Sequence, residues 1–217
     1  MAKFEKANSV GEWLEQRLNI KAINKVMMTE YWIPKDINFL WAMGVLLATT
    51  FTILVISGLF LMMYYKPDIN LAFDSVNYTI MQEVAFGWLF RHIHGVAASV
   101  VFLVIYIHMF TGIYYGSYKQ GREMIWISGM LLFVTFSAAG FSGYMLPWGQ
   151  MSYWAAMVIT NLFGGVPVIG DALVVWIRGD FNVADATLTR FFMLHVFLLP
   201  IAIMGLIGLH FYTLRIP

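Results

Sequence analysis

Four histidines at regular spacing are the residues of this sequence best suited to chemistry. His94 and His108 lie 14 residues apart in one uncharged apolar segment, and His195 and His210 lie 15 residues apart in another. Neutral imidazole is a common metal ligand, and apolar surroundings keep it unprotonated. The four histidines therefore indicate metal ligation or, alternatively, hydrogen-bonded core positions or a proton relay.

The composition around these histidines is that of a membrane protein. Of the 217 residues, 60% are hydrophobic and only 12% are charged, which is outside the balance of a soluble domain. A spanning helix needs about 20 apolar residues. Four segments without Asp, Glu, Lys or Arg are long enough, namely residues 37–65, 93–118, 124–146 and 191–214.

We therefore expect an all-α membrane protein. A four-helix transmembrane domain over residues 37–217 follows an N-terminal amphipathic interfacial segment over residues 1–36. The PWG sequence at residues 147–149 ends the third span. The apolar segments 151–163 and 171–179 are too short to cross the bilayer, and we expect interfacial helices there.

Charge and cysteine content exclude several classes of function. The net charge of +1 and the lack of a basic cluster give no reason to expect a nucleic-acid partner. The absence of cysteine excludes disulfides, iron-sulfur ligation and thioether-attached heme within this chain. The N-terminal residues lack the features of a signal peptide, so we expect no cleavage.

The distribution of Lys and Arg predicts the orientation of the spans. Positive charges precede the first span and occupy the loop between the second and third, which places both on the inner, cytoplasmic side. With four spans, both termini lie inside. The second and fourth spans then run in the same direction, so the histidines pair by depth: His94 with His195 near the outer side, and His108 with His210 near the inner side.

The spacing allows both histidines of each helix to face one bundle core. Intervals of 14 and 15 residues correspond to about 21 and 22 Å along a helix, and they fall within roughly 40° and 60° of one face. Pro200 can adjust the longer interval by a local kink. Two pairs of buried imidazoles are the axial ligands that two six-coordinate hemes require.

Glycines repeat the interval of the histidines. The first and third spans each carry two glycines 14 residues apart, where a macrocycle would need close approach of the neighbouring backbone. The alternative is simple close packing between helices. These glycines are Gly44, Gly58, Gly129 and Gly143.

Two arginines lie near the outer histidines. Arg91 precedes His94 by three residues and Arg190 precedes His195 by five. We expect them to bind the propionates of the outer heme, because guanidinium binds carboxylate bidentately; ordinary anchoring at the interface is the alternative. His92 projects away from His94 on a helix, so we expect an interfacial residue there.

Several strings resemble the heme-binding N-terminal half of cytochrome b from quinol-oxidising bc and b6f complexes. They are FGWLFRHIHG, HMFTGIYYGSY, GYMLPWGQMSYWAAMVITNLF and ATLTRFFMLH. The resemblance implies two non-covalent b-type hemes, with low potential at the outer pair and high potential at the inner pair. It also implies that Trp41 and Trp126 lie near the inner heme, and that the outer quinol-oxidation site draws on Gly143, Trp148, Met151 and Trp154.

The sequence departs from the family pattern at several points. Thr111 stands where the family usually has arginine, and Val55 where glutamine is common. The 15-residue interval and Arg215 resemble the short b6 type, whereas YYGSY and PWGQMSYW resemble the long bc type. The second half of cytochrome b is absent from these residues, so a separate chain or a missing segment must supply it.

The resemblance implies a diheme subunit of a quinol:cytochrome c, or plastocyanin, oxidoreductase in an energy-transducing membrane such as the bacterial inner membrane. The subunit would carry electrons from outer quinol oxidation to inner quinone reduction in a proton-motive Q cycle and would be inactive alone. The implied partners are a Rieske iron-sulfur protein, a c-type cytochrome and the C-terminal half of cytochrome b, in a dimeric complex. One alternative is a diheme anchor that passes electrons between quinone and a peripheral dehydrogenase; another is a heme-free transporter bundle.

Overall fold

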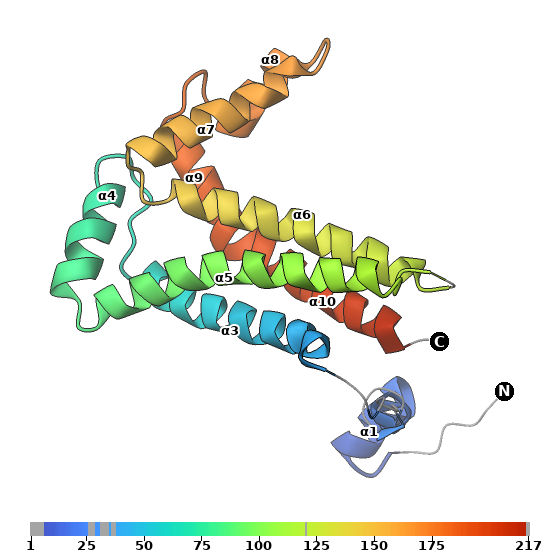
Figure 1. Cartoon of the computed structure of the whole chain (residues 1–217). Coiled ribbons are helices and arrows are strands. Elements are labelled where there is room, and N and C mark those ends of the chain that lie inside the picture. The colour runs from blue at the N-terminus through green and yellow to red at the C-terminus, as the bar shows by residue number, and fades with distance from the viewer. Residues whose placement is uncertain (1–6, 26–28, 31–34, 36–37, 120, 216–217) are drawn as a thin grey trace.

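The fold is a bundle of four long helices. The computed structural model describes residues 7–25, 29, 30, 35, 38–119 and 121–215, and within these ranges the chain is helical without strands. Four helical stretches are long and apolar enough to cross a membrane: Phe39–Met62, Gly87–Tyr114, Glu123–Met145 and Asp185–Arg215. They lie side by side in Figure 1. The expected all-α fold with four membrane spans is confirmed, and the protein is an integral membrane protein.

The bundle consists of two pairs of neighbouring helices. In the first pair, α3 (Met43–Met62), preceded by the 3-10 helix η2 (Phe39–Ala42), packs along α5 (Gly87–Tyr114). In the second pair, α6 (Glu123–Met145) packs along α10 (Leu199–Arg215). Each histidine-bearing span therefore lies against a span that carries two of the regularly spaced glycines.

The expected starts of the second and fourth spans are wrong. These helices begin at Gly87 and Asp185, six residues before the expected starts at 93 and 191. Each span was expected to begin only after the last charged residue before it, but Arg91 and Arg190 both lie inside the helices. A long arginine side chain can extend toward the membrane surface from a helical position, so the charge does not end the helix.

The fourth span changes its helical type close to its first histidine. It comprises α9 (Asp185–Met193), the π-helical turn η5 (Leu194–Leu198) and α10. The Leu199 N–H donates to the Leu194 carbonyl, a π-type bond over five residues. Pro200 follows and has no N–H to continue the regular ladder. A π-helical turn accommodates one extra residue, which accounts for an interval of 15 residues on this helix and 14 on α5.

The apolar core lies between the two histidine levels. Its most buried member, Ile203, lies between His195 and His210 on the fourth span. Phe51 and Phe136 add an edge-to-face ring contact at 5.6 Å between the two helix pairs. The buried cluster is Val101, Ile105, Phe136 and Ile203. A dry layer of this kind separates the outer pair of histidines from the inner pair.

A helical segment that the sequence did not predict connects the first two spans. It comprises α4 (Ala72–Asp74) and the π-helix η3 (Ser75–Glu83), and it ends in an extended residue, Val84. Gly87 then packs so close to the Ile80 carbonyl that no Cβ fits between them. In Figure 1 this segment lies at one end of the bundle, and α7 begins near the same end.

Helices α7 (Gln150–Leu162) and α8 (Gly170–Arg178) occupy the two short apolar segments that follow the third span. The backbone turns at Trp148, which has a positive φ of 51°. The buried Arg178 fastens the two helices together, with its Nε donating to Thr160 Oγ1 at 2.9 Å and its Nη2 to Asn161 Oδ1 at 2.8 Å. Thr187 of α9 donates to the Arg178 carbonyl, so three elements meet at this arginine.

The N-terminal segment is helical over part of its described length. Helix α1 (Val10–Leu18) begins after Ser9, whose Oγ accepts from the Glu12 N–H, and is followed by Asn19 in a left-handed conformation. The short α2 (Ile20–Asn24) follows. Helix α1 and the end of α10 lie toward the same end of the bundle (Figure 1), the end to which the sequence analysis assigns the inner side.

Candidate functional site

The four histidines form two facing pairs inside the bundle. The ring centroids of His94 and His195 are 6.1 Å apart, and those of His108 and His210 are 6.4 Å apart. The planes of the two rings make an angle of 79° in the first pair and 71° in the second. Two imidazoles that bind one metal ion from opposite sides, through bonds of about 2 Å, have centroids roughly 6 Å apart. Each pair is therefore spaced to bind one metal ion from two sides.

Each of these histidines faces one of the four regularly spaced glycines. A Cβ built on Gly58 would lie 3.1 Å from His94 Cε1, and one on Gly129 would lie 3.3 Å from His210 Cε1. A Cβ on Gly143 would overlap the ring of His195, whereas one on Gly44 would make an ordinary contact of 3.9 Å with His108. The backbones of α3 and α6 thus come close to all four imidazoles.

Hydrogen bonds hold the Nδ1 atom of three of the four rings. His94 Nδ1 lies 3.0 Å from Ser57 Oγ, and His210 Nδ1 lies 2.9 Å from Ser128 Oγ. His195 Nδ1 donates to the Ala139 carbonyl at 2.8 Å. A histidine that donates from Nδ1 keeps the lone pair on Nε2 for a metal. The three rings are therefore held in the tautomer that binds a metal through Nε2.

The serine hydroxyls already have acceptors of their own, which settles the direction of two of these bonds. Ser57 Oγ donates to the Ile53 carbonyl at 2.6 Å, and Ser128 Oγ donates to the Ile125 carbonyl at 3.0 Å. Because each hydroxyl has one proton, its oxygen is free to accept. Nδ1–H of His94 and of His210 is then the donor to the serine.

The donor set fits heme iron. In the part of the chain that the structure describes, no three His, Cys, Asp or Glu residues form a metal-binding group. Two imidazoles per site leave the remaining positions of a six-coordinate iron to another ligand, and a porphyrin supplies four nitrogens in one plane. The glycines leave no side chain beside these rings, where such a macrocycle needs space.

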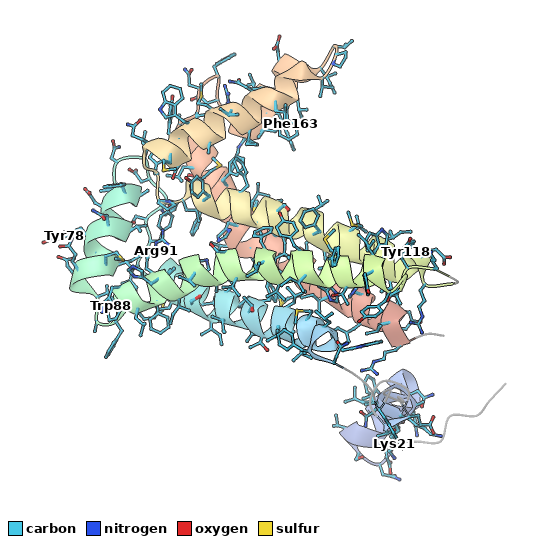
Figure 2. The ribbon with its side chains drawn as sticks, viewed as in Figure 1. Lys21, Tyr78, Trp88, Arg91, Tyr118 and Phe163 are labelled. Atoms are coloured by element: carbon cyan, nitrogen blue, oxygen red, sulfur yellow. The ribbon has the colours of Figure 1, made fainter. Side chains whose placement is uncertain are left out.

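The two arginines that precede His94 and His195 have different neighbours. Arg91 lies next to the segment formed by α4 and η3 (Figure 2), and its Nη1 reaches toward Gly95. It lines a cavity of about 420 Å³ together with His92. Arg190 instead donates to the Trp176 carbonyl at the end of α8. The structure therefore shows Arg91 beside a cavity and Arg190 bonded to the backbone of α8.

The four residues expected at the outer quinol site have different surroundings. Trp148 lines a cavity of about 380 Å³ with Phe73, Gly149, Gln150 and Tyr153. Gly143 faces the ring of His195 instead. Met151 and Trp154 point outward on α7, with 74% and 58% of their surfaces exposed.

Near the inner pair, Trp126 packs against Gly112, four residues after His108. Trp41 lies on η2 and is exposed. Thr111 bonds back to the Ile107 carbonyl within its own helix. Near the other pair, His92 bonds to the Trp88 carbonyl, and it takes no part in the His94–His195 pair.

The serines beside the histidines were not predicted from the sequence. Serine in a membrane helix ordinarily bonds to its own backbone, so a single serine carries no signal. The available signal was the dipeptide Ser-Gly, which places a serine directly before three of the four glycines: Ser57, Ser128 and Ser142.

Comparison with known proteins assigns the family. The family model described as cytochrome b/b6/petB matches residues 28–216. The chain is 48% identical to cytochrome b of Allochromatium vinosum, over 94% of this chain and 49% of that protein, and 47% identical to cytochrome b of Rickettsia conorii, over 97% and 52%. The chain thus spans about half the length of these curated relatives.

A solved structure has the same arrangement of helices. A chain of a hyperthermophilic respiratory complex III superposes with a TM-score of 0.81 at 40% sequence identity, covering 95% of this chain and 55% of the other. Members of the matched family bind b-type heme, and the paired histidines provide the ligands that such binding needs. The sequence match, the helix arrangement and the facing histidines agree: this chain belongs to the cytochrome b family.

Proposed function

We propose that the chain binds two b-type hemes, one between His94 and His195 and one between His108 and His210. The observation that carries this proposal is the geometry of the pairs, with centroids 6.1 and 6.4 Å apart and a glycine against every ring. Heme iron, when bound, supplies one-electron redox chemistry at each level of the membrane. Following the family, the outer heme has the lower potential.

The residues of the chain provide the setting for electron transfer. The histidines bind through Nε2, while Ser57, Ser128 and the Ala139 carbonyl hold the opposite ring nitrogens. The apolar cluster around Ile203 excludes water between the two levels. Arg91 and Arg190 place positive charge at the outer end, where carboxylate groups of a heme could bind.

We further propose that the chain is the diheme part of a quinol-oxidising complex that carries electrons from an outer quinol-oxidation site to an inner quinone-reduction site. Its partners would be a Rieske iron-sulfur protein, a c-type cytochrome and the other half of cytochrome b, in a dimeric assembly. Moving charge across the membrane against its potential requires about 2.3 kcal/mol per 100 mV, so this step would store energy as proton-motive force. The family assignment favours this function over an anchor for a peripheral dehydrogenase.

The test is to purify the native complex from membranes and to measure heme content and redox difference spectra. We expect two b-type hemes per chain. His94→Asn should remove the outer heme and leave the inner one, and His210→Asn should do the reverse. His92→Asn is the matched control, since this neighbouring histidine bonds to the Trp88 carbonyl and should be dispensable for both hemes.

Absence of b-type heme from the native complex would refute the proposed ligation. Co-purification with a dehydrogenase, in place of a Rieske protein and a c-type cytochrome, would refute the proposed complex while leaving the heme sites intact.

A further inference from the structure

The serines next to two of the histidine-facing glycines form a repeated structural unit. In α3, Gly58 faces the His94 ring and the preceding Ser57 bonds to its Nδ1 at 3.0 Å. In α6, Gly129 faces the His210 ring and the preceding Ser128 bonds to its Nδ1 at 2.9 Å. The two units lie at opposite depths of the bundle, one at each histidine pair.

A backbone carbonyl completes each unit. The carbonyl of Leu54, four residues before Gly58, accepts from Ser57 Oγ at 3.2 Å. The Ile125 carbonyl, four residues before Gly129, accepts from Ser128 Oγ at 3.0 Å in the same way. Both serine side chains are nearly inaccessible, with 2% of their surfaces exposed. Water therefore cannot easily replace the hydroxyl.

We propose that Ser57 and Ser128 are positioning residues, one for each heme, which accept the Nδ1–H of a ligand histidine and so fix its tautomer and ring orientation. This inference rests on the proposed heme ligation by His94 and His210. A hydrogen bond from Nδ1–H makes the imidazole a stronger electron donor to iron. Stronger donation stabilises the oxidised iron and lowers the midpoint potential of that heme.

A third serine provides an internal control. Ser142 precedes Gly143 in the same way and has only 1% of its surface exposed. Its hydroxyl donates to the Ala138 and Ala139 carbonyls, while His195 Nδ1 bonds to the Ala139 carbonyl and not to the serine. Ser142→Ala therefore removes an equally buried hydroxyl from the outer level without removing a bond to an imidazole.

The experiment is a redox titration of the purified complex carrying Ser57→Ala or Ser128→Ala. We expect Ser57→Ala to raise the midpoint potential of the outer heme alone, and Ser128→Ala that of the inner heme alone. Each should also weaken retention of its own heme about tenfold, the lower end of the range for partners of metal ligands. The assignment of each signal to a level comes from His94→Asn and His210→Asn. Ser142→Ala should leave both potentials unchanged.

Two further variants separate hydrogen bonding from packing. Ser57→Thr keeps the hydroxyl and should restore the potential of the unsubstituted complex. Ser57→Cys keeps a side chain of similar size, but sulfur is a weak acceptor, so it should raise the outer potential as alanine does. This variant also keeps the test valid if the alanine variant fails to assemble.

Equal potentials in the Ser57→Cys, Ser142→Ala and unsubstituted complexes would overturn the positioning role. So would a shift of both hemes together in the Ser57 variants, because that would indicate a general change in packing. Failure of the proposed function itself would show differently, as absence of two b-type hemes from the unsubstituted complex.

Discussion

Individual glycines set how closely the α3 and α6 backbones approach the histidine rings. The four positions differ in available space: a Cβ would overlap the ring at Gly143, would be tight at Gly58 and Gly129, and would make an ordinary contact at Gly44. The same substitution should therefore have a graded effect, which ordinary helix–helix packing at all four positions would not produce.

We predict that glycine-to-alanine substitution weakens heme binding in this order. Gly143→Ala should be the most damaging, because the methyl group must displace the His195 ring; overpacking of this kind costs about 1–3 kcal/mol, or roughly one to two orders of magnitude in affinity. Gly58→Ala and Gly129→Ala should be intermediate, and Gly44→Ala the mildest. Heme content of the purified complex at the outer and inner levels measures each effect.

The control for this series is Gly205→Ala on α10, where an added Cβ meets nothing within 4 Å. It should leave heme content unchanged and add up to about 1 kcal/mol of helix stability. Equal heme loss in all four variants, or heme loss in the control, would show that ring contact does not determine the role of these glycines.

The histidine pairs were predictable and the serines were not, for a physical reason. Pairing by depth follows from the number of spans and the direction of each span, both of which the charge pattern gives. Ser57 and Ser128 each bond to a carbonyl of their own helix as well as to a ring. Sequence alone cannot distinguish that serine from one that bonds only to its own backbone.

Among the elements, the π-helical turn η5 determines the register of the fourth span. It spans Leu194–Leu198, so it includes His195 and ends shortly before Pro200, and it accommodates one residue more than a regular helix would. His210 therefore faces His108 although its interval from His195 is one residue longer than the matching interval on α5. The proline signalled a local irregularity in the sequence, but its hydrogen-bond pattern became visible only in the structure.

This register leads to a deletion experiment. Removing the exposed Phe197 together with Pro200→Leu should convert η5 into regular helix with a 14-residue interval, so both hemes should be retained. Removing Met204 from the regular helix α10, with Pro200 kept, should rotate His210 by about 100° and eliminate the inner heme. Heme counting and difference spectra of the two variants decide the outcome. Equal heme loss in both would show that η5 does not absorb the extra residue.

Other elements followed from the sequence to different degrees. The four spans coincide over most of their length with uncharged apolar runs, because burial in lipid leaves that pattern. The short helices α7 and α8 coincide with the two short apolar segments after the third span. The helix starts at Gly87 and Asp185 could not be predicted from these runs, because arginine is compatible with a helix end near the membrane surface. Segment η3 gave no signal either, since its sequence SVNYTIMQE mixes polar and apolar residues without a clear period.

At the scale of the whole molecule, the two ends of the bundle differ in what they carry. One end has α4, η3, α7 and α8 (Figure 1). The other has the basic residues Lys21, Lys119 and Arg122, and Figure 2 shows Lys21 and Tyr118 toward that end. Positive charge near the ends of spans favours the cytoplasmic side, so the basic end should face the cytoplasm.

The absence of cysteine from the sequence makes this orientation directly testable. We predict that Asn182→Cys, an exposed position between α8 and α9, reacts with a membrane-impermeant maleimide added to intact spheroplasts. Ser117→Cys, an exposed and nearly isosteric change after α5, should react only in inverted vesicles or after the membrane is made permeable. The unsubstituted chain is the control and should not react in any preparation. Labelling of Ser117→Cys from outside would reverse the orientation, and with it the assignment of His94 and His195 to the outer level.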